Sequence, residues 1–147
     1  RTPSSAASDV YKRQILNDAG LSLHSRKVGN FVLEESREAT RSMFLSNPPE
    51  AVFVANDHMA FAVMDTLRYE LGLKIPDDVS VVGYDDVPAA SWPSYLLTTV
   101  QQPVNIMVRE TVEILIEKIE NPEARPQKIK VDGPLILRKS AKIHKGH

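Results

Sequence analysis

Residues 51–86 read AVFVANDHMAFAVMDTLRYELGLKIPDDVSVVGYDD and carry the strongest fold signal in the chain. Residues 51–55 are a continuous apolar run of strand length, which is typical of a strand buried on both faces. From Asp57 to Leu71 apolar side chains recur at helical spacing, and Gly72 suits the position that follows a helix. Residues 79–84 form another apolar run of strand length. The stretch therefore predicts a strand–helix–strand unit with two parallel strands.

The chain on either side of this unit continues the alternation of strands and helices. We expect further strands at 26–31, 97–101, 128–131 and 135–137, and further helices at 34–45 and 104–120. Residues 15–21 (ILNDAGL) are typical of a helix end, with Gly20 after the last turn. Because strands alternate with helices, we predict an α/β protein with right-handed crossovers and a largely parallel sheet.

The composition is that of an ordinary globular protein and excludes several classes. The chain has 147 residues, of which 42% are hydrophobic and 25% are charged. No apolar run approaches the ~20 residues that a membrane-spanning helix needs. The absence of cysteine excludes a disulfide framework, thiolate metal sites and a cysteine nucleophile. A net charge of −1 argues against a surface that binds DNA by neutralising its phosphates.

The first fourteen residues, RTPSSAASDVYKRQ, are small, polar and aperiodic, unlike the rest of the chain. Residues 4–14 resemble the translation of a common transposase sequencing adapter. We interpret residues 1–14 as a non-native, disordered scar on a truncated reading frame, and a genuine disordered N-terminus is the alternative. The stretch lacks the apolar core of a secretory signal, so the sequence does not support export.

Polar and aromatic side chains follow the predicted strands at the positions where open parallel sheets bind ligands, beyond the carboxyl ends. Phe31 ends the strand at 26–31, Asn56 follows 51–55, and Asp85 and Asp86 follow 79–84. Amide and carboxylate groups suit the hydroxyls of a sugar, and an aromatic ring suits its apolar face. Together these positions indicate a site for a small polar ligand.

Each of these residues also has a purely structural interpretation. Asn56 or Asp57 suits the N-cap of the helix that begins there, and the two acidic residues after 79–84 suit a turn. Phe31 and Trp92 suit a hydrophobic core or an interface. The residues alone leave these interpretations open beside the ligand site.

The motifs of the common enzyme classes are absent from the sequence. It has no GxSxG elbow, no Walker A loop, no GxGxxG after a strand and no HExxH. The four histidines lack metal-ligand spacing, and Asp85 and Asp86 are adjacent on an extended segment, where side chains point apart. We therefore expect no enzyme, no metal and no cofactor.

Three motifs in order, AND at 55–57, IPDDVSVVGYDD at 75–86 and LTTVQQP at 97–103, resemble the LacI/GalR family of bacterial transcription regulators. The resemblance extends from Ile15 to about Ala141 and includes GPLILRKSA at 133–141. It implies a two-lobed, periplasmic-binding-protein-like effector domain behind an N-terminal helix-turn-helix. Residues 15–101 and about 134–141 are then the second lobe, and 103–131 belong to the first lobe.

The resemblance implies roles for individual residues. Asn56, Asp85 and Gln102 are expected to hydrogen-bond a small effector, a sugar or a nucleobase, and Phe31 is expected to stack on it. Asp86 is expected to be structural. Asn30 stands where the family usually has Asp, and the arginine that binds effector in the family is expected upstream, where residues 1–14 now lie.

The resemblance also implies partners. A homodimer is expected through the helix at 57–71, with Phe61, and through the loop around Trp92. Operator DNA is expected to bind only through the missing N-terminal domain, and no membrane is expected. Helix 104–120 is expected to expose an apolar stripe with Val108, Leu115 and Ile119. We therefore predict the effector-binding part of a cytoplasmic transcriptional regulator; the alternatives are a periplasmic sugar-binding protein of a transporter and, more remotely, a sugar-modifying enzyme.

Overall fold

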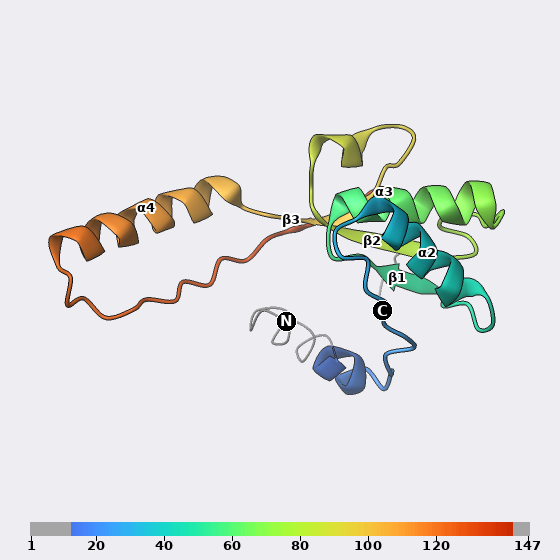
Figure 1. The fold of residues 1–147 in the computed structure, drawn as a ribbon, viewed down its shortest axis with the longest axis horizontal. Helices are drawn as coiled ribbons and strands as arrows, with labels where there is room; N and C mark the ends of the chain where they lie inside the picture. Colours follow the sequence, from blue (N-terminus) through green and yellow to red (C-terminus); the bar gives the residue numbers. More distant parts are fainter. Residues whose placement is uncertain (1–12, 143–147) are drawn as a thin grey trace, which may run out of the picture.

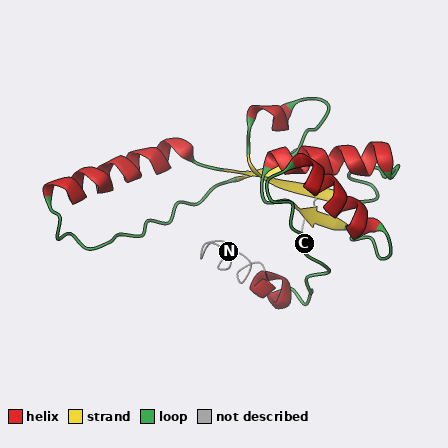
Figure 2. Cartoon of the chain, viewed as in Figure 1, coloured by secondary structure: helices red, strands yellow, loops and turns green. Residues whose placement is uncertain are grey.

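The computed structural model describes residues 13–142 and contains a four-stranded sheet in the order β1–β2–β3–β4 (Figures 1 and 2). Strands β1, β2 and β3 are parallel, and β4 is antiparallel to β3. The strands are β1 (Ala51–Phe53), β2 (Ser80–Asp85), β3 (Thr98–Gln101) and β4 (Leu135–Ile136). The helices are α2 (Leu33–Phe44), α3 (Asp57–Asp65) and α4 (Val104–Glu120), with a π-helical turn η1 (Thr66–Glu70) and a 3-10 turn η2 (Pro88–Ser91). The predicted α/β class and the mostly parallel sheet are confirmed.

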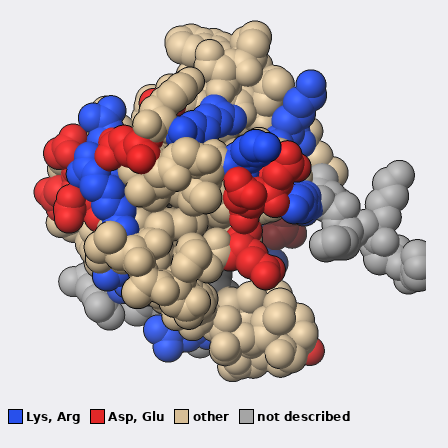
Figure 3. Space-filling view, turned by 90° about the vertical axis from the view of Figure 1, so that its right-hand side faces the viewer, with Lys and Arg blue, Asp and Glu red and all other residues tan. Residues whose placement is uncertain are grey.

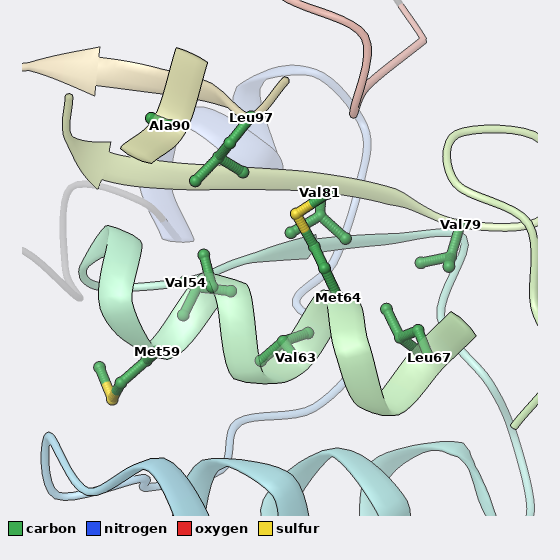
Figure 4. Close-up of a cluster of buried hydrophobic side chains, with 10 residues drawn as sticks. Val54, Met59, Val63, Met64, Leu67, Val79, Val81, Ala90 and Leu97 are labelled. Atoms are coloured by element: carbon green, nitrogen blue, oxygen red, sulfur yellow. The ribbon is translucent and has the colours of Figure 1, made fainter. Parts of the chain in front are cut away.

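The hydrophobic core lies between α3 and the sheet, as Figure 4 shows. One face of α3 and η1 supplies Met64 and Leu67, both fully buried, and β2 supplies Val81. Burying each of these side chains contributes about 1.5–3 kcal/mol. The helix ends where the sequence predicts, since Leu71 follows η1 and Gly72 has a φ of 67°.

Two predicted strands do not form. Residues 26–31 and 128–131 are irregular, so β1 has a neighbour on one side only. Phe53 is 44% exposed, and the expectation that residues 51–55 are buried on both faces is wrong. An apolar run of strand length forms a central strand only when a second strand pairs with each of its edges.

A short segment after β4 is inserted between the amino-terminal ends of β2 and β3. The Oγ of Ser140 donates to Val81 O at 2.7 Å and accepts from Thr98 N at 2.7 Å. The backbone N of Val81 donates to Ser140 O at 2.7 Å, and Ser140 is fully buried. Residues close to the C-terminus therefore complete the sheet.

Helix α4 projects away from this body as an arm, and the chain returns from it beside β3 (Figure 1). No residue of α4 is buried, and the exposed fractions are 55% for Val108, 58% for Leu115 and 71% for Ile119. The predicted exposure of the apolar stripe is confirmed. A 17-residue helix gains most of its stability from packing. The apolar face of α4 is therefore of the kind that packs against another element.

Residues 1–12 lie outside the described residues, whereas Arg13 and Gln14 are helical in a turn that continues to residue 18. The expectation that residues 1–14 are non-native and disordered stays a prediction. Gly20 follows with a φ of 71°, as predicted for a helix end. Within residues 13–142 no helix combines the length and apolarity needed to cross a membrane.

Candidate ligand-binding site

The carboxyl ends of the parallel strands lie at one edge of the sheet. β2 pairs with β3 as far as Asp85 opposite Gln101, so Gln102 follows at the same edge. β1 is parallel to β2, and Asn56 lies between its end and the start of α3. Three of the four predicted ligand contacts therefore come from neighbouring strand ends.

Asp85 and Gln102 are in direct contact. The Nε2 of Gln102 donates to Asp85 Oδ1, and the backbone N of Gln102 donates to Asp85 O at 3.3 Å. Burial raises the pKa of the Asp85 carboxyl, while hydrogen bonding from Gln102 opposes the rise and the nearby charge of Asp57 adds to it. A half-buried carboxylate beside an amide offers acceptors and a donor to adjacent hydroxyl groups.

The turn after β2 has a strained backbone. Asp85 has a φ of 127° and Asp86 a φ of 58°, and such positive values cost on the order of 1–3 kcal/mol each for residues other than glycine. Asp86 accepts from Arg138 Nη2 at 2.7 Å and from Gln101 Nε2 at 2.9 Å. These bonds agree with the structural role expected for Asp86, and they hold the turn in its strained conformation.

Asn56 is the N-cap of α3. Its Oδ1 accepts from Met59 N at 2.8 Å, which satisfies one of the backbone N–H groups left over at a helix start. The side chain also carries an NH₂ group, which is chemically able to donate to a ligand. The cap and the predicted ligand role use different atoms of the same side chain.

Asp57 has a role that the sequence did not reveal. Instead of capping α3, its carboxylate is fully buried and accepts from Thr99 Oγ1 at 2.6 Å and from Val87 N at 3.0 Å. A Cβ at position 83 would collide with Asp57 Oδ1, which explains the glycine in the middle of β2. In the sequence, an Asp at a helix start is interpreted as a cap. Its contacts with a Gly and a Thr on two later strands are long-range and cannot be predicted from neighbouring residues.

Phe31 lies apart from the Asp85–Gln102 pair. It is 74% exposed, has a φ of 59° and lines a largely apolar cavity of about 820 Å³ with walls from α2, β1 and residues 22–31. Ala55, directly before Asn56, and Met59, whose backbone N Asn56 caps, also line this cavity. A smaller hollow of about 310 Å³ is lined by residues 101–106, including Gln102. The predicted ring stacking by Phe31 therefore stays a prediction.

Phe61, one of the two predicted interface residues, is half-buried and lies in a group of aromatic side chains packed against the core. Phe61 stacks on Tyr95 with ring centroids 4.3 Å apart, and the His58 and Phe61 rings are nearly perpendicular with centroids 6.0 Å apart. Trp92 is 57% exposed in the loop that follows η2. Burial and the neighbouring Asp65 raise the pKa of Tyr95, whose OH contacts Asp65 at 3.3 Å.

Charged side chains of both signs lie next to one another on the face drawn in Figure 3. Arg41 contacts Glu34, Glu38 and Glu70 and joins α2 to η1. The hydrogen bond from Arg41 lowers the pKa of Glu70. The face drawn in Figure 3 is unlike the uniformly basic surface that phosphate binding needs.

Comparison with known proteins agrees with this geometry. A family model described as a periplasmic binding protein-like domain matches residues 6–141. The match begins within residues 1–14, whose non-native origin stays a prediction. The chain is 32% identical over 128 residues to the HTH-type transcriptional repressor PurR of Photobacterium profundum, covering 85% of the chain and 38% of the repressor. It is 34% identical over 145 residues to the ribose operon repressor of Escherichia coli (strain K12), covering 96% of the chain and 43% of the repressor.

Solved structures give the same picture. The transcriptional regulator CelR in complex with cellobiose superposes with a TM-score of 0.80 at 32% identity, over 88% of the chain and 40% of the regulator. A LacI family transcriptional regulator from Lactobacillus casei with bound sucrose superposes with a TM-score of 0.61 at 31% identity. The match covers 74% of the chain and 40% of the regulator. The chain spans less than half the length of each of these relatives.

Proposed function

The chain belongs to the periplasmic binding protein-like domain family, and on this basis we propose that it is the ligand-sensing and dimerising portion of a LacI/GalR-type transcriptional regulator. One structural observation carries the proposal. Asp85 and Gln102, from the ends of two neighbouring parallel strands, contact each other at the edge of the sheet where such folds bind ligands.

The chemistry of the site favours a sugar, with a nucleobase as the other effector class. Asp85 accepts hydrogen bonds, and the amides of Gln102 and Asn56 both donate and accept, as adjacent hydroxyls require. Relatives whose names mention ribose, and neighbours solved with cellobiose and sucrose, support the same class. Phe31 then supplies the apolar contact.

The mechanism is a shift in population between two arrangements of the lobes. Residues 15–101 and about 134–141 form one lobe, and 103–131 supply parts of the other. The chain passes between the body and the arm at two places, the chain crossings, one next to Gln102 and the other next to Gly133. The crossing at Gln102 includes a proposed ligand contact. Effector that contacts Gln102 therefore favours one orientation of the arm, which changes operator affinity by differential binding.

The proposed partners follow from the same family membership. A second copy docks through Phe61 and the loop around Trp92, where the exposed indole ring of Trp92 supplies apolar contact area. Operator DNA binds through a domain N-terminal to this chain, and the protein acts in the cytoplasm without catalysing a reaction. A transporter's sugar-binding protein has less support, because the reported relatives are named as repressors.

Operator binding by a longer form that includes the upstream domain tests this function. Gel-shift titrations with and without ribose, cellobiose, sucrose, adenine or guanine should give a specific complex whose affinity changes at least fivefold with one compound. Residues 15–147 alone should form no specific complex. Specific operator binding by residues 15–147 alone contradicts the assignment of DNA binding to the upstream domain.

A further inference from the structure

Asp57 connects three parts of the molecule that are distant in sequence. It is the first residue of α3, its Oδ1 accepts from Thr99 on β3, and its Oδ2 accepts from the backbone N of Val87. Its carboxylate lies directly over Gly83 of β2. A buried carboxylate placed at a helix N-terminus is stabilised by the helix dipole and by its two donors, so Asp57 is a fixed point within the fold.

The bond to Val87 matters because of the turn that precedes it. Asp85 and Asp86 both have positive φ, and a non-glycine turn of this kind persists only when its surroundings hold it. Arg138 holds Asp86, and Asp57 holds Val87. With residues 86 and 87 held in this way, Asp85 immediately before them contacts Gln102.

We propose that Asp57 is the positioning residue of the ligand site: it fixes the turn 85–87 against β3 and thereby sets the position of Asp85 relative to Gln102. Asp57 acts through Val87 and Thr99 and does not itself contact ligand. The inference rests on the proposed function for its relevance to ligand binding, whereas the positioning itself is a property of the free protein.

Two substitutions separate the hydrogen bonds of Asp57 from its charge. Asp57→Ala removes both acceptors and releases Val87 N. Asp57→Asn retains both contacts, because the amide oxygen accepts from Val87 N while the NH₂ group donates to the Thr99 hydroxyl, which also accepts. Positioning through hydrogen bonds therefore predicts that Ala disrupts the site and Asn preserves it.

The first test needs no ligand. Hydrogen exchange of the Gln102 side-chain amide, followed by nuclear magnetic resonance in the 147-residue chain, reports its bond to Asp85. We expect exchange at least fivefold faster in Asp57→Ala and within twofold of wild type in Asp57→Asn. Val79 lies just before the first residue of β2, about 20 Å along the strand from Asp85. Val79→Ala destabilises the core and should leave this exchange unchanged.

Equal exchange in wild type and Asp57→Ala would overturn the inference, and so would equal acceleration by Asp57→Ala and Val79→Ala. If Asp57→Ala does not fold, Thr99→Val tests the inference instead, because it replaces the hydroxyl that bonds Asp57 by a methyl group of similar size. Thr99→Val should also accelerate exchange of the Gln102 side-chain amide. An unchanged exchange rate in this variant would contradict the proposal.

The second test measures ligand affinity in the longer regulator with the panel of ribose, cellobiose, sucrose, adenine and guanine. For a compound that binds wild type, Asp57→Ala should weaken binding at least tenfold, Asp57→Asn less than threefold, and Val79→Ala not at all. Unchanged affinity in Asp57→Ala overturns the inference while leaving the proposed function intact. If no compound binds wild type, the proposed function fails for these ligands, and the exchange measurement still decides the positioning role.

Discussion

Arg138, from the segment that follows β4, donates to Asp86 at 2.7 Å, and its other guanidinium nitrogen donates to Leu97 O at 2.8 Å. Both charged side chains are largely buried. The segment that returns from the arm is thus bound to the turn that carries Asp85. Ligand site and C-terminal segment form one connected structure.

Replacing Arg138 should therefore cost stability. Arg138→Ala leaves the Asp86 carboxylate without its cation, which we expect to lower the free energy of unfolding by about 2–4 kcal/mol in urea titrations. Arg138→Lys should recover part of the loss, because it keeps the charge but not the fork that also reaches Leu97. A loss below about 0.5 kcal/mol in Arg138→Ala would show that the pair contributes little.

Ser140 should be as important as a core side chain despite its size. Ser140→Ala removes the hydroxyl that bonds Val81 O and Thr98 N and leaves two buried backbone groups unpaired. We expect a loss of about 2 kcal/mol in the same urea titration. Ser91→Ala is the matched control, since its hydroxyl bonds Pro88 O at the surface and its removal should change stability by less than about 0.5 kcal/mol. Equal effects at both positions would contradict the inserted role of Ser140.

Gly133 packs against the chain crossing that leads to α4. A Cβ at this position would collide with the carbonyl oxygen of Gln101, and backbone atoms have little room to move. Gly133→Ala should therefore separate the two crossings and destabilise the pairing of β3 with β4. Hydrogen exchange of the Gln101 amide, which donates to Pro134 O at 2.9 Å, should accelerate at least fivefold. Unchanged protection of that amide would mean that the collision is relieved without loss of pairing.

Helix α4 should tolerate charges on its apolar stripe in this chain. Leu115→Lys and Ile119→Lys replace exposed side chains, so the melting temperature should stay within about 2 °C while binding of a hydrophobic dye decreases. In the longer regulator, where we propose that this face packs on the first lobe, the same changes should lower the melting temperature. A large loss of stability in the 147-residue chain would show that the stripe is already covered.

The sequence predicts most of α2, α3, β2, β3 and α4 because their signals are local. Gly72, Pro103 and the helical spacing of apolar residues act within a few residues of each element. The strands at 26–31 and 128–131 do not form, because a strand depends on a neighbour elsewhere in the chain. Asp57 was hidden for the same reason, since its partners Val87 and Thr99 are 30 and 42 residues away.

The candidate site was predicted at the level of residues but not of contacts. Asp85 and Gln102 were each expected to bind ligand, and the structure adds that they bind each other. Neither the strained turn at Asp85 and Asp86 nor the anchor at Arg138 follows from the motifs, because both depend on tertiary packing.

The pKa of Asp85 gives the chain a pH dependence with a defined sign. Burial raises this pKa above its usual value of 3.8, so the folded protein holds the proton more tightly than the unfolded chain. Stability should therefore fall as pH rises from 3.8 through the folded-state pKa, and then level off. Asp85→Asn should remove this contribution and be more stable at pH 7 in urea titrations. If the free energy of unfolding changes with pH in the same way in wild type and Asp85→Asn, Asp85 is not the source of this pH dependence.

The most direct test of the central claim is the ligand-induced shift in melting temperature of the longer regulator, measured in wild type and Asp85→Ala with ribose, cellobiose, sucrose, adenine and guanine. A ligand that binds the folded state raises the melting temperature by mass action. We predict a rise of several degrees with one compound in wild type and no rise in Asp85→Ala. An equal rise in both proteins would contradict a ligand site at Asp85 and Gln102.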